Sequence, residues 1–173
     1  WLVVALIGAL WFVAVPGWTL DIGGATLPET ITAGDVALIL NGAGLRKKFF
    51  IKIYAGALYL PGKENDPRWI ITADKPMAVR MHFIYDGVAA EKLVETWNEG
   101  FEKATNGNIA PLSDRISTFN SLFTKEAGEG DVYDMIYVPG SGVRVVMNGK
   151  TAGIVEGLDF KKALFAIWLG DAP

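Results

Sequence analysis

The residues best able to do chemistry lie in one stretch, from Asn41 to Pro61. Arg46 follows a glycine-rich segment, and Tyr54 lies in the apolar run that comes next. An arginine carries a permanent charge and a planar fork of N–H donors that matches a carboxylate or an enolate-like oxygen. At the mouth of an apolar cleft it would bind the head of an amphipathic anion, with the tail among hydrocarbon side chains. The same residues also fit a solvated loop cluster, so both interpretations stay open.

The elements that must position these groups are a turn and a long strand. Asn41 to Gly44 has turn chemistry, because Asn and Gly tolerate positive φ. The run from Phe49 to Leu60 is apolar, aromatic and β-branched with a single charge, which predicts a buried strand. Strand alternation places Lys52, Tyr54 and Leu58 on one face. Polar groups on a buried face need partners, so this face is the clearest indication of a site.

A second strand with polar side chains is predicted from Met77 to Tyr85. Its alternation places Arg80 and His82 on one face and Met81 on the other. The two basic side chains point either into a cleft or into solvent, and the residue types do not decide between these.

Composition limits the class of protein. The chain has 173 residues, 51% of them apolar, and a net charge of −3, which predicts one folded domain and argues against disorder. Its basic residues are scattered, so it lacks the patch expected of a nucleic-acid-binding surface. With no cysteine and one histidine, disulfides, thiol nucleophiles and a zinc cluster are excluded. We expect no metal and no other cofactor.

The N-terminus has the pattern of an export signal. Residues 1–20 carry no charge, and Leu2 to Val15 form an almost unbroken apolar run. That length suits a secretory signal better than a membrane span, which needs about 20 apolar residues. An uncleaved anchor and a buried core helix are the alternatives. We predict an export signal or hydrophobic segment at 1–19, a domain at 20–173 and a periplasmic or secreted location. Membrane contact is expected only through the N-terminal segment, if it is uncleaved.

The remaining elements predict a mixed fold. Asp66-Pro67 is a helix start, because Asp is a common N-cap and Pro fits the first helical position. Asn148-Gly149 is the strongest sign of a tight hairpin. The order of strands, helices, strands and a last helix predicts an α+β domain, an antiparallel sheet with helices on one face. Helices are predicted at about Arg68 to Thr72, after Asp86-Gly87, from near Pro111, and from about Leu158 to Leu169.

Two segments give the sequence a family resemblance. NGAGLRKKFFIKIYAGALYL at 41–60 and DFKKALFAIWLGDAP at 159–173 resemble the chalcone isomerase-like proteins, especially their bacterial, exported branch. The resemblance implies an open-faced β-sandwich, a large antiparallel sheet with helices layered on one face and a ligand cleft between them. The family includes plant enzymes that cyclise chalcones and non-catalytic relatives that bind fatty acids.

The resemblance also assigns roles to particular residues. Arg46 matches the arginine that meets the ligand's anionic oxygen in both kinds of relative. Tyr54 stands near a threonine of the enzymes, and Arg80 is the best match to a basic residue on the strand before the first long helix. Ala89 and Thr96 stand where the enzymes have a tyrosine and an asparagine, so two of their polar groups are missing.

These observations lead to three hypotheses. The first is an exported, non-catalytic binder of a small amphipathic anion such as a fatty acid, held by Arg46 with help from Tyr54 and Arg80. The second is a chalcone isomerase-type intramolecular lyase acting on an unsaturated ketone, with Arg46 and Tyr54 as catalytic residues. The third is an interaction module whose cleft is filled by its own side chains. The candidate wall residues of the cleft are Phe50, Leu58, Met81 and Trp97.

Overall fold

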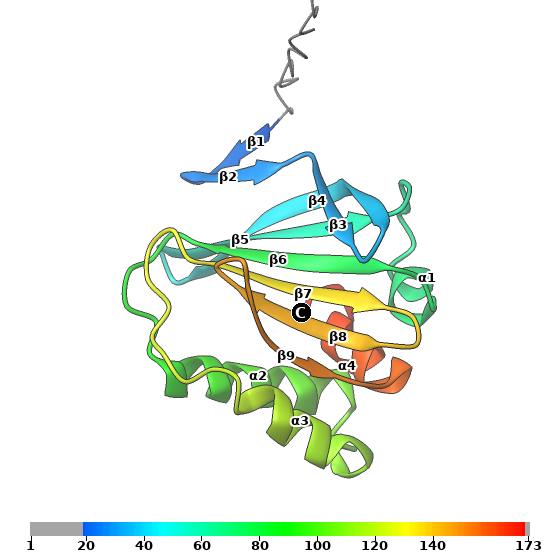
Figure 1. Ribbon diagram of the computed structural model, residues 1–173. Coiled ribbons are helices and arrows are strands. Elements are labelled where there is room, and N and C mark those ends of the chain that lie inside the picture. The colour runs from blue at the N-terminus through cyan, green and yellow to red at the C-terminus, as the bar shows by residue number, and fades with distance from the viewer. Residues whose placement is uncertain (1–18, 172–173) are drawn as a thin grey trace, which may run out of the picture.

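A seven-stranded antiparallel sheet dominates the computed structural model, which describes residues 19–171 (Figure 1). The strands lie in chain order, each beside the next, so every connection joins neighbours. The expected α+β class is confirmed. The strands are β3 (Thr30–Ala33), β4 (Val36–Lys48), β5 (Ile51–Leu60), β6 (Met77–Phe83), β7 (Val132–Val138), β8 (Gly142–Met147) and β9 (Lys150–Val155).

All the helices of the described residues cover one face of this sheet, as Figure 1 shows. The predicted start of the first one is confirmed, because the Asp66 side chain accepts a hydrogen bond from the backbone N–H of Arg68. The last helix has the bounds expected from the sequence. The helices are α1 (Pro67–Thr72), α2 (Ala90–Ala104), α3 (Ser113–Asn120) and α4 (Leu158–Leu169), with a 3₁₀ turn η1 (Ala110–Leu112) before α3.

The main core lies between the sheet and the helices. The apolar stripe of α2 faces inward, with Leu93, Trp97 and Phe101 buried. Aromatic rings from different elements meet edge to face here, such as Phe101 and Phe119, whose centroids are 5.8 Å apart. Such pairs add stabilisation beyond the burial of apolar area. This core holds the helices against the sheet.

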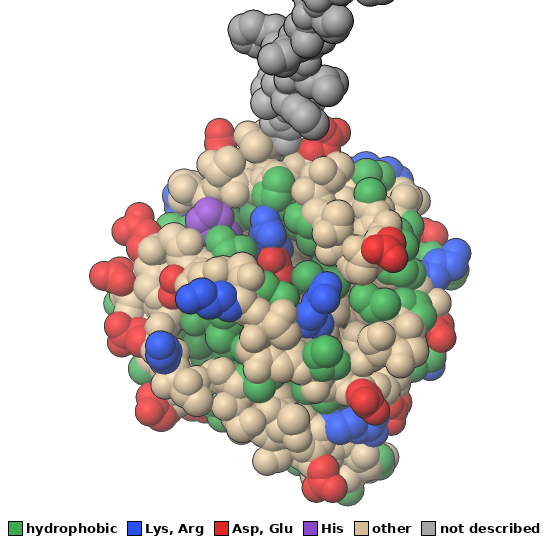
Figure 2. All heavy atoms as spheres, viewed as in Figure 1, with side chains coloured by type: hydrophobic (Ala, Val, Ile, Leu, Met, Phe, Trp, Pro, Cys, Tyr) green, Lys and Arg blue, Asp and Glu red, His purple; other side chains and the backbone are tan. Residues whose placement is uncertain are grey.

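A smaller core lies on the opposite face of the sheet. There β1 (Thr19–Ile22) and β2 (Ala25–Pro28) form a separate antiparallel hairpin. Leu27 of the hairpin is fully buried with Ala55 and Ala57, whose small side chains leave room for it. The hydroxyl of Tyr59 donates to the carbonyl of Pro28 at 2.9 Å. Figure 2 looks onto this side of the molecule, where apolar side chains remain exposed between charged ones.

The predicted turn at Asn41 to Gly44 is wrong. This segment continues β4. The pairing of β4 with β5 has a bulge between Leu40 and Gly42, and the conformational freedom of glycine suits such a bulge. The chain reverses instead at Phe49-Phe50, and Phe49 has a φ of 55°. A second bulge lies between Arg46 and Lys47 in this pairing. It places Lys52 and Tyr54 on opposite faces of the sheet, although strict alternation predicts the same face for both.

The Asn148-Gly149 hairpin is confirmed. Asn148 and Gly149 both have positive φ, 51° and 77°, which matches the twist of the flanking strands. The pair connects β8 to β9 in two residues. It is the tight turn that the residue types predicted.

A buried lysine anchors the end of α1. Lys161 of α4 is fully buried, and its Nζ donates to the carbonyls of Ile70, Ile71 and Ala73 at 2.7, 2.9 and 2.9 Å. These include carbonyls that the end of a helix leaves without an intrahelical partner. Burial lowers the pKa of Lys161 to about 8. Sequence reasoning missed this residue, because nothing in the local sequence distinguishes it from Lys162, which is only half-buried.

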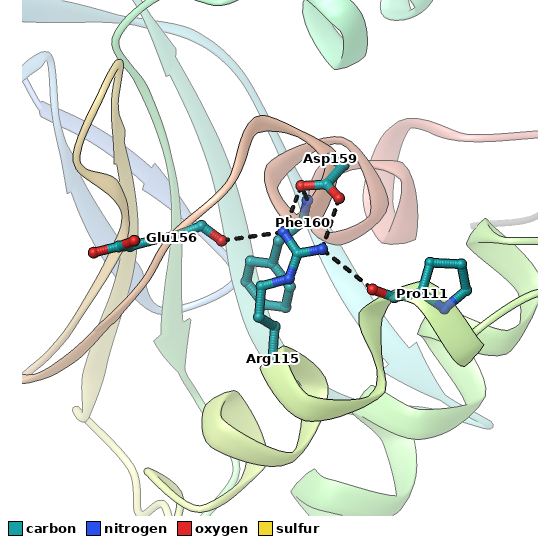
Figure 3. A network of polar contacts seen from close by, with 5 residues as sticks. All are labelled: Pro111, Arg115, Glu156, Asp159 and Phe160. Carbon is teal, nitrogen blue, oxygen red and sulfur yellow. Dashed lines mark hydrogen bonds and ion pairs between the residues drawn. The ribbon is translucent and has the colours of Figure 1, made fainter.

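Arg115 ties α3 to the beginning of α4 (Figure 3). Its guanidinium donates to both carboxylate oxygens of Asp159, and also to the carbonyls of Pro111 and Glu156. The arginine holds the pKa of Asp159 below its usual range. Because both side chains of the ion pair are partly exposed, its main role is to fix the orientation of the two helices.

The predicted export segment at 1–19 lies outside the described residues except for Thr19, which begins β1. Between residues 19 and 171, no helix has the length and apolar character that crossing a membrane requires.

Candidate functional site

The site begins with Arg46 and Tyr54, which are directly opposed across the β4–β5 pair. Directly opposed residues of an antiparallel pair share a face of the sheet. Here it is the face covered by helices, because the Tyr54 ring packs on Phe83 in the main core, with centroids 5.8 Å apart. The sequence therefore identified two side chains that the fold does bring together.

A tryptophan from the last helix completes this corner. The Nε1–H of Trp168 donates to the hydroxyl of Tyr54 at 3.0 Å. Burial raises the pKa of Tyr54, against the opposing effects of the Trp168 hydrogen bond and the Arg46 charge, so the group is a neutral hydroxyl at physiological pH. A phenol can accept and donate at once. No described residue accepts the Tyr54 proton, which leaves it available to a ligand oxygen.

Arg46 lies at the outer edge of this corner. Its side chain is exposed, and no carboxylate of residues 19–171 lies within ion-pair distance of it. The β4 backbone beside Arg46 is not covered by other side chains, because a Cβ built on Gly42 or Gly44 would meet no atom within 4 Å. Gly44 is two residues from Arg46 and so faces the same way. The corner thus offers a free guanidinium next to uncovered backbone.

The inner side of the corner is apolar. Leu58 and Met81 belong to the main core with Tyr54, as does Trp97. The rings of Trp97 and Trp168 meet edge to face with centroids 5.6 Å apart. The buried Nε1–H of Trp97 has no hydrogen-bond partner among the described residues. Three of the four predicted wall residues therefore lie on the same side of the sheet as Tyr54.

Arg80 does not belong to this site. It lies on the other face of the sheet and donates to both carboxylate oxygens of Asp134, at 2.7 and 2.9 Å. Burial acts to lower the pKa of Arg80, but the hydrogen bond and charge of Asp134 outweigh it and raise the pKa. The correction follows from strand alternation, since Arg80 and Met81 are neighbours on β6 and cannot line one cleft.

Phe50 does not belong to it either. It lies in the turn between β4 and β5 and is 100% exposed. The sequence assigned it to the strand beside Lys52 and Tyr54, but the turn comes eight residues later than expected, so Phe50 leaves the sheet. It cannot be a wall residue of a cleft.

The space between sheet and helices is filled by the protein's own side chains around Tyr54. The two best-formed hollows of the described residues lie elsewhere and are shallow. The first is lined by Thr19, Leu20, Glu29 and Leu40. The second is lined by residues 60–64 with Trp69 and Lys75. Neither hollow is lined by Arg46 or Tyr54, and the ring of Tyr54 packs against the side chains of the main core.

The two positions that depart from the plant enzymes supply no free polar group to this site. Ala89 precedes α2 and is exposed. Thr96 is exposed on α2, and its hydroxyl donates back to the carbonyl of Lys92 at 2.8 Å. Among residues 19–171, no three acidic or histidine side chains are grouped so as to hold a metal ion.

Comparison with known proteins agrees with this fold. Residues 19–173 match the family model described as chalcone isomerase-like, so the chain belongs to that family. Among solved structures it is similar to a fatty-acid binding protein of Arabidopsis thaliana, with a TM-score of 0.74 and 19% sequence identity. The match covers 90% of this chain and 91% of the other, and at this identity it shows a shared fold. No curated protein matches the sequence.

Proposed function

We propose that this protein binds a small amphipathic anion, such as a fatty acid, and leaves it chemically unchanged. The observation that carries the proposal is the corner formed by Arg46, Tyr54 and Trp168. It offers one permanent positive charge and one hydroxyl proton, both free, at the edge of an aromatic core. A carboxylate is the natural complement of such a pair, because a guanidinium donates through two parallel N–H groups.

The head group binds outside the main core in this proposal. Arg46 is exposed and Tyr54 is inside, so a carboxylate between them keeps part of its hydration. A charge left partly in water avoids the large cost of burying an ion. The hydroxyl of Tyr54 adds a second, directional contact whose acceptor side is already held by Trp168.

The tail enters between the sheet and the helices. Because the interior is closed, side chains such as Trp97 and Leu58 must move to admit it. The buried Nε1–H of Trp97 has no hydrogen-bond partner among the described residues. In a well-packed interior almost every buried polar group has such a partner, so this part of the core is exceptional. That marks the region of Trp97 as the place where the core gives way to a ligand.

The similar solved structure supports a binder over an enzyme. The solved structure that shares the fold is itself described as a fatty-acid binding protein. Ala89 and Thr96 provide neither the hydroxyl nor the amide that the plant enzymes use at those positions. Export to the periplasm or outside is part of the proposal, on the basis of the uncharged, apolar residues 1–18.

A binding titration tests the proposal. The full chain is delipidated and titrated with hexadecanoate, with tryptophan fluorescence as the signal, because Trp168 and Trp97 line the path. Loss of a charge-assisted hydrogen bond costs about 1.5–3 kcal/mol. We expect Arg46→Ala to weaken binding about tenfold to a hundredfold.

Lys47→Ala is the matched control, since it removes the same charge from the opposite face of the same strand. It should bind hexadecanoate like the unchanged protein. If the unchanged protein binds no fatty acid, or if both variants lose affinity equally, the proposed site is wrong.

The isomerase hypothesis has its own test. If the protein were an enzyme, Arg46 and Tyr54 would polarise the ketone oxygen of an unsaturated ketone. We expect the absorbance of a chalcone to decay no faster with the protein than in buffer. Turnover that disappears in Arg46→Ala would establish catalysis and replace the proposal.

A further inference from the structure

The turn between β4 and β5 combines exposed aromatic side chains with clustered positive charge. Phe49 and Phe50 are 86% and 100% exposed, and Ile51 is 48% exposed. Large apolar side chains gathered this way on a surface mark an interaction site more often than isolated ones do. We propose that this tip inserts into an anionic lipid bilayer.

The charge around the tip fits that partner. No acidic residue occurs from 36 to 63, although the whole chain has a net charge of −3. Within seven residues the segment carries four exposed cations, Arg46, Lys47, Lys48 and Lys52. One acidic residue outside the segment, Glu95 of α2, has its pKa lowered by Lys92 and more weakly by Lys48. Each basic residue at an anionic leaflet strengthens binding about fivefold.

The order of residues along the hairpin matches the layers of a bilayer. The two phenylalanines form the apex, and the four cations lie one to three residues behind it. At about 3.3 Å per residue, this places the charges within roughly 10 Å of the apex. Apolar groups of interfacial proteins reach ~5–10 Å into the boundary between headgroups and acyl chains. The apex therefore reaches the acyl layer while the cations lie level with the lipid phosphates.

The cations also lie on both faces of the ribbon. Arg46 shares the helix-covered face with Tyr54, whereas Lys47 is opposed to Lys52, which donates to the Gly23 carbonyl on the opposite side. Charges on both sides suit a ribbon that stands upright among headgroups. A protein partner docked on one face of the ribbon would leave half of them unused.

The backbone of the turn supports a functional choice of residues. Phe49 has a φ of 55°, a conformation that is costly for a bulky side chain and common for Asn or Gly. The β8–β9 hairpin of the same sheet uses Asn148-Gly149 for its two-residue turn. The first turn thus holds a phenylalanine at position 49, where the backbone favours Asn or Gly.

A fluorescent label at the tip tests the inference without interference from residues 1–18. The chain has no cysteine, so Phe50→Cys gives one labelling position for an environment-sensitive dye, and Lys150→Cys gives a matched position beside the other turn. The probes are vesicles of phosphatidylcholine, with and without a quarter of phosphatidylglycerol. We expect a blue shift and rising intensity at position 50 only, with anionic vesicles only, weakened at high salt.

Two further variants make the result decisive. Lys47→Gln with Lys48→Gln and Lys52→Gln in the labelled protein should weaken vesicle binding more than tenfold. Phe49→Asn with Phe50→Gly, tested by its thermal midpoint, should fold at least as stably as the unchanged protein, because it installs a favourable turn.

Three outcomes would overturn the inference. These are no shift at position 50, equal shifts at both positions, and a shift that ignores lipid charge. A shift that grows with protein concentration without vesicles would assign the tip to a second copy of the chain instead. None of these outcomes depends on whether a fatty acid binds at Arg46.

Discussion

The two faces of the seven-stranded sheet treat positive charge in opposite ways. On the face without helices, Arg80 is held by both oxygens of Asp134, and the pair is largely buried. On the helix-covered face, Arg46 lies at the rim and has no carboxylate partner among the described residues. Both are strand arginines, and the sequence placed both in one site.

This contrast distinguishes a charged side chain that the fold requires to be paired from one that is free to bind a ligand. A buried arginine without its carboxylate would be an uncompensated charge, so the partner of Arg80 is part of the fold. An exposed arginine carries no such requirement and can accept a carboxylate from outside. Lys161 is a third case, a buried cation on the helix side that is held by backbone carbonyls alone.

Asp134→Ala should have the largest effect on stability. It leaves Arg80 without its partner in a largely buried place, and breaking a buried pair in this way costs about 3–5 kcal/mol. Urea denaturation followed by circular dichroism measures the loss. Arg46→Ala, the counterpart on the other face, should change the free energy of unfolding by less than about 0.5 kcal/mol. Equal losses in both variants would contradict the contrast between the faces.

Lys161 should make stability depend on pH in the alkaline range. Its pKa is about 8 in the folded protein, below its ordinary value of 10.5, so between these pH values the unfolded chain binds the extra proton. The free energy of unfolding therefore rises by about 2 kcal/mol between pH 8 and pH 10. Lys161→Met lacks this titration, and the difference between the two proteins in urea denaturation isolates it. If the unchanged protein lost stability relative to Lys161→Met as the pH rises, the assignment would be wrong.

Tyr54→Phe should have a smaller effect that is confined to the corner. It removes the acceptor of the Trp168 N–H, and loss of one such hydrogen bond costs about 1 kcal/mol. Hexadecanoate binding should weaken less than it does in Arg46→Ala, because a neutral donor is lost instead of a charge. Urea denaturation and the fluorescence titration give the two values. A loss of affinity larger than that of Arg46→Ala would make Tyr54 the main anchor.

Arg115→Ala should have a small effect compared with Asp134→Ala. Like Arg80, Arg115 donates two hydrogen bonds to one carboxylate, although it does so through Nη1 and Nη2 and Arg80 through Nε and Nη2. Its partner Asp159 is mostly exposed, and exposed ion pairs contribute about 0–1 kcal/mol. Urea denaturation should show a loss several times smaller than that of Asp134→Ala. If the two losses were alike, burial would not be what distinguishes the pairs.

Local chemistry was enough for much of the fold. The Asp66 cap, the Asn148-Gly149 turn and the bounds of α4 all follow from residues close together in the chain. The buried side of α2 follows the same rule, because Leu93, Trp97 and Phe101 recur at helical spacing and all three are buried. The glycines at 42 and 44 misled the same reasoning, since they fit a turn or a bulge equally well.

The site was predicted in part for the same reason. Arg46 and Tyr54 were chosen for their chemistry, and antiparallel pairing happens to oppose them. Trp168 joins them from a segment 114 residues away, and no local pattern indicates that contact. Arg80 was misplaced because charge was weighed without its face, although alternation along the strand already set it against Met81.

The sequence by itself determined the family and the class of fold, and it singled out Arg46 and Tyr54, which we propose bind an anion. It did so because helix caps, turns and apolar periodicity are properties of neighbouring residues. Only the tertiary structure decided which cations have partners, which face each occupies, and that two phenylalanines form an exposed tip. Those outcomes depend on burial and on the pairing register of the strands. A single bulge shifts that register and so changes the face of every residue beyond it.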